Sequence, residues 1–349
     1  MLSLDSRLTG EVICLRPSMI KFDGSTSMDI ELCSSSSKPL PMYLNRQVIK
    51  IFEDMGVDYE WFQALQSQEV ARLRNITTTS ARAANFLQSQ LIGQHSYLPW
   101  FLKKLFSMGL EFRSDRFLRE TLELAVMMQV RVIKYRARIP VPLGTTLYGI
   151  MDETDTLEEG QIFCVFDHNG KKSNLVWDRV VITRAPALHP GDVQTVDAVS
   201  VPKDSPLRYL CNCVVFSQRG DRDLPSKLSG GDLDGDLYNV IWDPGCSPQR
   251  CLPPADYPRV PAEDIRRTVE RDDMTDFFVK FMETDQLGRI ATAHQILADQ
   301  KPSGTLDRDC TLLAELHSTA VDFSKTGVPV SCPGSFCYQM LPVPFAAKF

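Results

Sequence analysis

Alternating apolar and polar residues near the start of the chain predict short strands. Glu11–Arg16 and Met28–Cys33 follow a period of two, and Met19–Phe22 lies between them with turn residues on either side. Residues 34–41 contain four serines and two prolines, which is typical of a connector. We therefore expect strands within residues 11–33, followed by an irregular link.

The apolar spacing becomes helical after this connector. Val48, Ile49, Phe52 and Met55 recur at the period of a helix, and Gly56 is a stop signal. Similar patterns predict further helices at residues 59–73, 79–92, 99–108 and 115–129.

Strand patterns return in residues 130–139. One face of this strand would carry Lys134, Arg136 and Arg138, and Pro140 would end it. Because many short strands without long helices between them favour a barrel over a doubly wound sheet, we expect a compact barrel. Its other strands are predicted at residues 147–150, 162–166, 180–183, 210–216 and 237–242.

A linker rich in proline follows the barrel and leads to a last group of helices. Five prolines lie within residues 248–261. Helical patterns then cover residues 262–284, 286–298 and 312–322.

The stretch from Ser229 to Leu237 carries the clearest chemistry. Asp232, Asp234 and Asp236 stand at alternate positions among three glycines, directly before an apolar strand pattern. In an extended chain such side chains point to one side, and glycines let the backbone turn tightly or approach a ligand. Three close carboxylates repel one another unless a cation lies among them. Because ligands that are all oxygen favour Mg²⁺, we predict a catalytic magnesium loop.

Two other interpretations of this loop are weaker. A calcium loop of the EF-hand type would need Gly at position 237 and Glu at position 243, where Leu and Asp stand. A solvated acidic turn explains one or two carboxylates, but not three at strand spacing between glycines. Divalent ions held by such carboxylates would activate an attacking hydroxyl and stabilise a departing pyrophosphate, which is the chemistry of nucleotidyl transfer.

Basic and titratable residues upstream of the loop each admit two interpretations. Arg219 and Arg222 could hold triphosphate oxygens, or they could pair within their own loop with Asp221 and Asp223. His189 lies in a turn between prolines, where a structural role is more typical than general acid catalysis.

Composition and charge narrow the classes of function. The 349 residues carry a formal net charge of −6, so nucleic-acid binding would have to rest on a local basic surface. Residues 70–110 contain no Asp or Glu but hold five Arg and Lys, and a solvated face and a phosphate-facing surface are equally open. No signal peptide and no apolar run long enough for a membrane span is evident. Ten cysteines without CxxC spacing favour reduced thiols over disulfides or zinc.

Taken together, these segments resemble the eukaryotic cell-encoded RNA-dependent RNA polymerases of RNA silencing. The aspartate signature Ser229–Asp236 is accompanied, in order, by further matching segments from residue 11 to residue 330. These segments are Arg16–Phe22, Leu44–Ile49, Gly149–Thr154, Gly160–Gln161, Arg184–Asp192, Gly220–Arg222 and Ala320–Gly327.

The resemblance implies an α+β fold with two double-psi β-barrels that face each other across a cleft. Residues 131–245 would be the second, catalytic barrel. Family members are much longer, so residues 1–44 would be a remnant of the first barrel, with Lys21 contacting substrate. The other regions would be a helical connector at 45–130, a helical C-terminal region at 246–330 and a divergent tail at 331–349.

The resemblance also implies a function. It is RNA-directed RNA polymerase activity. Nucleotidyl groups from nucleoside triphosphates are joined into a new RNA strand on a single-stranded RNA template, and the product is double-stranded RNA for silencing. Asp232, Asp234 and Asp236 would bind catalytic Mg²⁺, and Arg219 and Arg222 would contact substrate. We expect an intracellular protein, in the nucleus or cytoplasm, with silencing-pathway proteins as partners and without a membrane.

Two rival functions remain open. The chain could be a catalytically incomplete fragment or paralogue that only binds RNA or a partner, through residues 70–110 and through Lys134, Arg136 and Arg138. Salt-sensitive RNA binding without nucleotide incorporation would favour that rival. The chain could also be a subunit of a DNA-templated polymerase, which parallel assays on RNA and DNA templates would separate.

Overall fold

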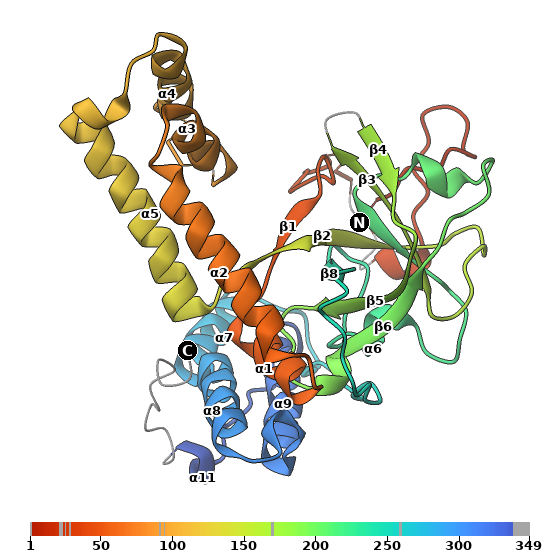
Figure 1. Cartoon of the computed structure of the whole chain (residues 1–349). Helices are drawn as coiled ribbons and strands as arrows, with labels where there is room; N and C mark the ends of the chain where they lie inside the picture. Colours follow the sequence, from red (N-terminus) through yellow and green to blue (C-terminus); the bar gives the residue numbers. More distant parts are fainter. Residues whose placement is uncertain are drawn as a thin grey trace.

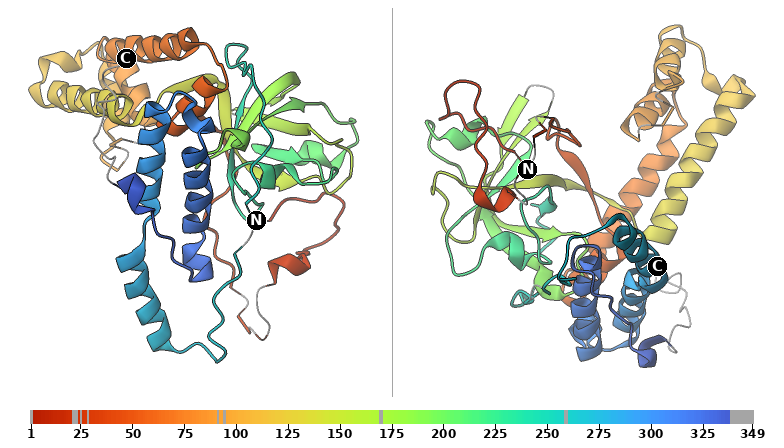
Figure 2. Two further views of the ribbon diagram at one scale, coloured as in Figure 1. Left: turned by 90° about the horizontal axis from the view of Figure 1, so that it is seen from below. Right: turned by 180° about the vertical axis from the view of Figure 1, so that it is seen from behind.

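A barrel of short strands forms one side of the molecule, and a pair of long helices projects from the other side (Figure 1). A further group of helices from the C-terminal part of the chain packs below the barrel and the base of the projection (Figure 2). This computed structural model describes residues 2–20, 24, 26–27, 29–90, 92–93, 95–168, 171–257 and 260–337.

The barrel is closed. Its strands are β2 (Pro140–Met151), β3 (Gln161–His168), β5 (Trp177–Arg184), β6 (Val193–Ala198), β7 (Cys213–Phe216) and β8 (Leu237–Ile241). They follow the order β2–β7–β3–β6–β5–β8, and β8 closes the circle by pairing with Gly144–Tyr148 in the middle of β2. The pairs β2–β7 and β3–β6 are parallel, and the other neighbours are antiparallel. Three of the described strands were not predicted: β6, which is part of the barrel, and two further strands, β1 (Leu40–Tyr43) and β4 (Lys171–Asn174), which pair with β2 and β3.

Burial of both faces of β3 explains its nearly continuous apolar sequence. Ile162 and Cys164 pack in the barrel core with Tyr238 and Val240 of β8. Phe163, on the opposite face of β3, belongs to a second apolar cluster beneath the loops that surround the barrel. A strand that is covered on both faces has no polar face to alternate with, so its sequence shows a run rather than a period of two.

The projection consists of α2 (Tyr59–Ile76) and α5 (Arg116–Arg136), which run side by side in opposite directions, with α3 (Ser80–Ser89) and α4 (Leu98–Ser107) at its tip (Figures 1 and 2). The short helix α1 (Arg46–Asp54) lies at its base. Polar caps fix the helix starts: Asn45 Oδ1 accepts a hydrogen bond from the Val48 amide, and Asp115 Oδ1 accepts one from the Leu118 amide, both at 2.8 Å. The helices that were predicted in residues 45–129 are confirmed.

The C-terminal helices pack mainly through α8 (Leu287–Gln300) and α9 (Arg308–Val321). The remaining helices are α6 (Leu224–Lys227), α7 (Arg271–Thr284), α10 (Phe323–Thr326) and α11 (Gly334–Cys337), with 3₁₀ turns at Pro17–Met19, Phe112–Ser114, Pro190–Asp192, Pro206–Tyr209 and Gly304–Leu306.

The helix that was predicted at 262–284 begins only at Arg271. A capping box between Glu270 and Asp273 starts the helix there, and Arg266 has a left-handed φ of 54°, which a helix does not tolerate.

The prediction of strands in residues 11–33 is wrong for the described part of that range. The described residues form a 3₁₀ turn at Pro17–Met19 and otherwise irregular chain, and none of the described strands pairs with them. A strand requires a hydrogen-bonded neighbour, so apolar alternation alone does not produce one. Lys21 lies outside the described residues.

The basic strand that was predicted at 130–139 is also wrong. Helix α5 continues to Arg136, with Ile133 buried on the same helical stripe as Leu122 and Ala125, and it ends at Ala137, whose φ is 50°. Lys134 and Arg136 therefore lie in the last helical turn, and Arg138 lies over the ring of Tyr43 at 4.1 Å. The β-branched residues of 130–133 are typical of a strand, but the buried stripe continues through them at helical spacing.

Candidate metal and catalytic site

The aspartates lie on a loop that leads into β8, not on the strand itself, which begins at Leu237. Two glycines allow the loop to adopt its shape. Gly235 has a φ of +136°, which other residues rarely adopt. A side chain at Gly231 would place Cβ 2.7 Å from both Arg184 Cδ and Tyr238 Oη, so only glycine lets the loop approach them.

The loop brings the three carboxylates together, as the alternation predicted. One carboxylate oxygen from each of Asp232, Asp234 and Asp236 lies within 4.8 Å of the others, and no other such group of three occurs in the described ranges. Backbone bonds hold this shape: the Asp232 amide donates to Asp236 Oδ2 at 2.9 Å, and the Asp234 amide donates to Asp232 Oδ1 at 3.2 Å. This cluster of oxygen donors fits a hard divalent cation.

The charges within the cluster also favour a cation. A hydrogen bond with Asp232, together with burial and the neighbouring carboxylates, raises the pKa of Asp234. Partial burial opposes ionisation of Asp232, but its hydrogen bonds with Asp234 and the charges of Lys325 and Arg184 outweigh it and lower the pKa. Two adjacent carboxyl groups thus hold their protons with unequal strength, and a bound cation would let both ionise.

Arg184 and Tyr238 fix the loop from the barrel side. Arg184, at the end of β5, is paired in register with Tyr238, at the start of β8. Its guanidinium forms an ion pair with Asp236, with Nε 2.7 Å from Oδ2 and Nη2 2.9 Å from Oδ1. The buried Tyr238 hydroxyl donates to the Asp232 carbonyl at 2.7 Å. Both ends of the aspartate loop are therefore attached to the barrel wall.

Asp192 anchors the start of the same loop. Its Oδ1 accepts hydrogen bonds from the Ser229 amide at 3.2 Å and the Tyr257 hydroxyl at 2.9 Å, and its Oδ2 accepts from the amides of Leu188 and His189. Burial raises the pKa of Asp192 to about 6, although these hydrogen bonds act in the opposite direction. One buried carboxyl group thus joins three separate segments of the chain behind the cluster.

The aspartate loop lines a small cavity of about 80 Å³ together with the C-terminal helices. Arg184 and Asp192 contribute to it from the barrel, His317 from α9, and Lys325 from α10. Neither Arg184 nor Lys325 was predicted from the sequence as a site residue. Both lie in segments that carried the family resemblance, Arg184–Asp192 and Ala320–Gly327, and this was the available signal.

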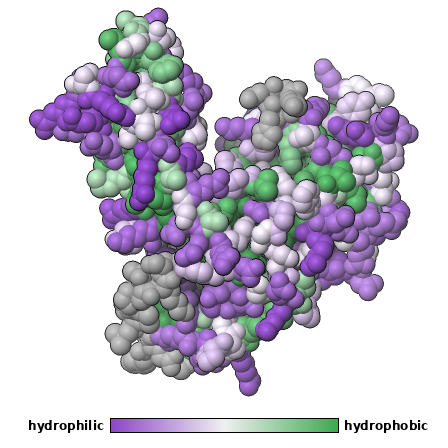
Figure 3. Space-filling model, in the orientation of Figure 1, coloured by the Kyte–Doolittle hydropathy of each residue, from purple (hydrophilic) through white to green (hydrophobic). Residues whose placement is uncertain are grey.

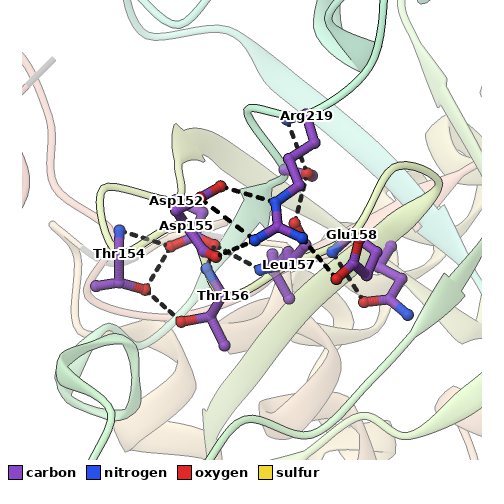
Figure 4. A network of polar contacts seen from close by, with 9 residues as sticks. Asp152, Thr154, Asp155, Thr156, Leu157, Glu158 and Arg219 are labelled. Carbon is purple, nitrogen blue, oxygen red and sulfur yellow. Dashed lines mark hydrogen bonds and ion pairs between the residues drawn. The ribbon is translucent and has the colours of Figure 1, made fainter.

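Arg219 and Arg222 are already engaged elsewhere. Neither Arg219 nor Arg222 is among the described residues that line the cavity. Arg219 forms ion pairs with Asp155 at 2.9 Å and Glu158 at 2.6 Å, within the network around Asp152 (Figure 4). These hydrogen bonds raise the pKa of Arg219. The guanidinium of Arg222 donates to Ser226 and to the Ala255 carbonyl. Their role in substrate binding stays a prediction.

His189 has the structural contacts that its turn indicated. Its Nδ1 accepts a hydrogen bond from the Gly191 amide at 2.9 Å, and burial lowers its pKa.

Burial raises the pKa of the Cys213 thiol to about 12, which favours the reduced thiol form that the sequence predicted.

None of the helices in the described ranges combines the length and apolar character that crossing a bilayer requires.

Comparisons with known proteins give a consistent result. The family model described as "RNA dependent RNA polymerase" matches residues 1–344. "Probable RNA-dependent RNA polymerase 1" of Oryza sativa subsp. japonica is 35% identical over 324 residues, which are 92% of this chain and 43% of that protein. "RNA-dependent RNA polymerase 2" of Arabidopsis thaliana is 36% identical over 341 residues, which are 92% of this chain and 29% of that protein.

The solved structure of "RNA dependent RNA polymerase QDE-1 from Thielavia terrestris" has a similar fold. Its TM-score is 0.65 at 21% identity, and the match covers 88% of this chain and 38% of that one. The predicted class, α+β with a double-psi β-barrel and helical regions, is confirmed. The chain spans less than half the length of each of these three relatives.

Proposed function

This chain belongs to the RNA-dependent RNA polymerase family, and from that premise we propose that it carries the metal-binding part of a centre for RNA synthesis on an RNA template. The observation that supports this most strongly is the convergence of Asp232, Asp234 and Asp236 on one loop, within 4.8 Å. The reaction is nucleotidyl transfer from nucleoside triphosphates on single-stranded RNA, and its double-stranded product serves RNA silencing in the nucleus or cytoplasm, with proteins of that pathway as partners.

In this proposal the three carboxylates hold Mg²⁺, which when bound activates the attacking hydroxyl and stabilises charge on the departing pyrophosphate. Arg184 keeps Asp236 in its orientation, and Tyr238 holds the backbone of Asp232. Such fixed ligands reduce the reorganisation that binding and reaction require. Lys325 adds a positive charge to the same cavity, which suits an anionic phosphate chain.

The domain assignment is also a proposal. In it, residues 1–44 are a remnant of a first barrel, with Lys21 as a substrate contact, and residues 45–130 form the connector. The second barrel spans 131–245, within which the strands begin at Pro140. Residues 246–330 form the C-terminal region, and 331–349 form a divergent tail. Arg219 and Arg222 would contact triphosphate only after releasing their present partners.

Replacing one cluster carboxylate tests the proposal. Asp236→Ala is expected to reduce labelled nucleotide incorporation on single-stranded RNA to background and to weaken Mn²⁺ binding measured by electron paramagnetic resonance. Asp221→Ala, which removes an exposed carboxylate upstream of the loop, is the matched control and should leave both signals unchanged.

The assay also separates the rivals. Full incorporation by Asp236→Ala would contradict the proposal. Incorporation on a single-stranded DNA template but not on RNA would favour a DNA-templated polymerase. RNA binding by the unaltered chain without any incorporation would favour a catalytically incomplete binding module.

A further inference from the structure

The outer part of the projection is built from the stretch of sequence that lacks acidic residues. Residues 70–110 form the second half of α2, all of α3 and all of α4. In Figure 1 this part lies at the end of the molecule that points away from the barrel. A protein with a net charge of −6 therefore has, at one extremity, a continuous stretch that carries five Arg and Lys and no Asp or Glu of its own.

A groove with a volume of about 480 Å³ lies between α2 and α3. Arg72, Asn75, Arg82, Asn85 and Ser89 line it with hydrogen-bond donors. Arg72 is held in place by two hydrogen bonds to Glu69, at 2.6 and 2.7 Å, and its guanidinium lies 5.9 Å from the ring of Phe86. The guanidinium of Arg82 donates to the Thr78 hydroxyl at 3.0 Å and keeps its positive charge available to an anion.

Helix α4 and its N-cap residue, Tyr97, present aromatic rings to solvent beside these cations. Tyr97 is 73% exposed, Trp100 is 63% exposed and Phe101 is 43% exposed. Lys104 follows Trp100 by one helical turn, and Lys103 joins α4 to α3 by donating to Gln88 Oε1 at 2.7 Å. In Figure 3 the projection shows hydrophobic and hydrophilic residues side by side on the face in view.

We propose that this surface, defined as the α2–α3 groove with the exposed face of α4, binds single-stranded RNA apart from the aspartate cavity. Cations and amides along a groove suit a phosphate backbone, and exposed rings give unpaired bases a face on which to stack. The absence of carboxylates in residues 70–110 favours a polyanion over an apolar protein partner, whose recognition would not require it. None of the residues that line the aspartate cavity belongs to this surface.

The test is fluorescence anisotropy of a labelled single-stranded RNA of about 12 nucleotides, a length in the range of known single-strand sites. The full chain is used with EDTA and without nucleotides, so the result does not depend on catalysis. Arg82→Ala/Lys104→Ala is expected to weaken binding about tenfold at low salt and to reduce the salt slope by about one to two. Trp100→Ala/Phe101→Ala should weaken binding by a similar factor with an unchanged salt slope.

Two control variants show whether a loss of RNA binding is specific to this surface. Lys203→Ala/Arg271→Ala removes the same charge from exposed positions on the barrel side and on α7, and it should retain binding. Asp236→Ala should also retain it, so that loss of incorporation and loss of this surface are distinguishable. Circular dichroism checks folding, and the single variants Lys104→Gln and Trp100→Phe, on the exposed face of α4, give the milder series.

Equal affinity of Arg82→Ala/Lys104→Ala and of the Lys203→Ala/Arg271→Ala control would overturn the proposal. It would also be overturned if Trp100→Ala/Phe101→Ala changed only self-association in sedimentation and left RNA binding intact. The exposed rings of α4 would then be an interface between protein copies.

Discussion

At the scale of the residue, Gly149 is required by the packing of the tyrosine that holds the aspartate loop. A Cβ at this position would lie 2.4 Å from Tyr238 Cε2 and 2.8 Å from Phe216 Cε2. Both rings are fully buried and pack edge to face, so neither can move without disturbing the barrel core.

We expect Gly149→Ala to lower the free energy of unfolding by about 1–3 kcal/mol and to weaken Mn²⁺ binding, because Tyr238 positions Asp232. Urea unfolding and electron paramagnetic resonance measure the two effects. The control is Gly288→Ala in α8, where a Cβ meets no atom within 4 Å, and it should be neutral or stabilising by up to about 1 kcal/mol. Equal stability of the two variants would show that the Tyr238 packing tolerates a methyl group.

At the scale of the element, Asp192 makes the attachment of the loop dependent on pH. Burial raises its pKa to about 6, above the value of about 3.9 in an unfolded chain. The folded state therefore binds the proton more tightly, and the stability that Asp192 contributes is present below pH 4 and is lost as pH rises through 6.

The free energy of unfolding of the native protein minus that of Asp192→Asn should accordingly decrease between pH 4 and pH 6 and stay constant above. An effect of the substitution on stability that does not depend on pH leaves the change of this difference with pH unaltered. Tyr257→Phe removes a hydrogen bond that lowers the pKa of Asp192, so it should move the decrease to higher pH. Denaturant titrations across this range provide the measurement, and a difference that does not vary with pH would refute the assignment.

Sequence patterns predicted the elements that are long or locally signalled. The helices of the projection have buried stripes and capping residues, such as Asn45 and Asp115, that lie within the segment itself. The prediction of a strand at residues 130–136 is wrong because β-branched side chains fit either a strand or a helix, and only packing against α2 and the core decides between them.

The same distinction between local signals and long-range packing applies to the candidate site. The convergence of the three aspartates could be predicted because spacing and glycines act within a few residues. The contact of Arg184 with Asp236 could not, because it joins residues 52 apart through the register of β5 and β8. Lys325 reaches the cavity only through the packing of the C-terminal helices against the barrel, which no local pattern encodes.

At the scale of the whole molecule, the aspartate cavity lies where the barrel meets the C-terminal helices, and Lys325 of α10 lines it from the helical side. The positive charge of the Lys325 ammonium group contributes to the lowered pKa of Asp232, and it opposes the rise in the pKa of Asp234 that the neighbouring carboxylates cause. The same positive charge repels a cation that binds the carboxylates. Lys325 therefore favours an anionic substrate but disfavours a metal ion that arrives alone.

We expect Lys325→Ala to tighten Mn²⁺ binding by about two- to fivefold at low salt, because its side chain is 70% exposed and the repulsion is partly screened by solvent. The gain should shrink as ionic strength rises. The same variant should bind nucleoside triphosphate more weakly when Mn²⁺ is saturating, since it loses a cation beside the phosphates. Calorimetric titrations of metal alone and of nucleotide with metal separate the two effects. If both affinities fell together, Lys325 would act by holding the C-terminal helices against the barrel rather than through its charge.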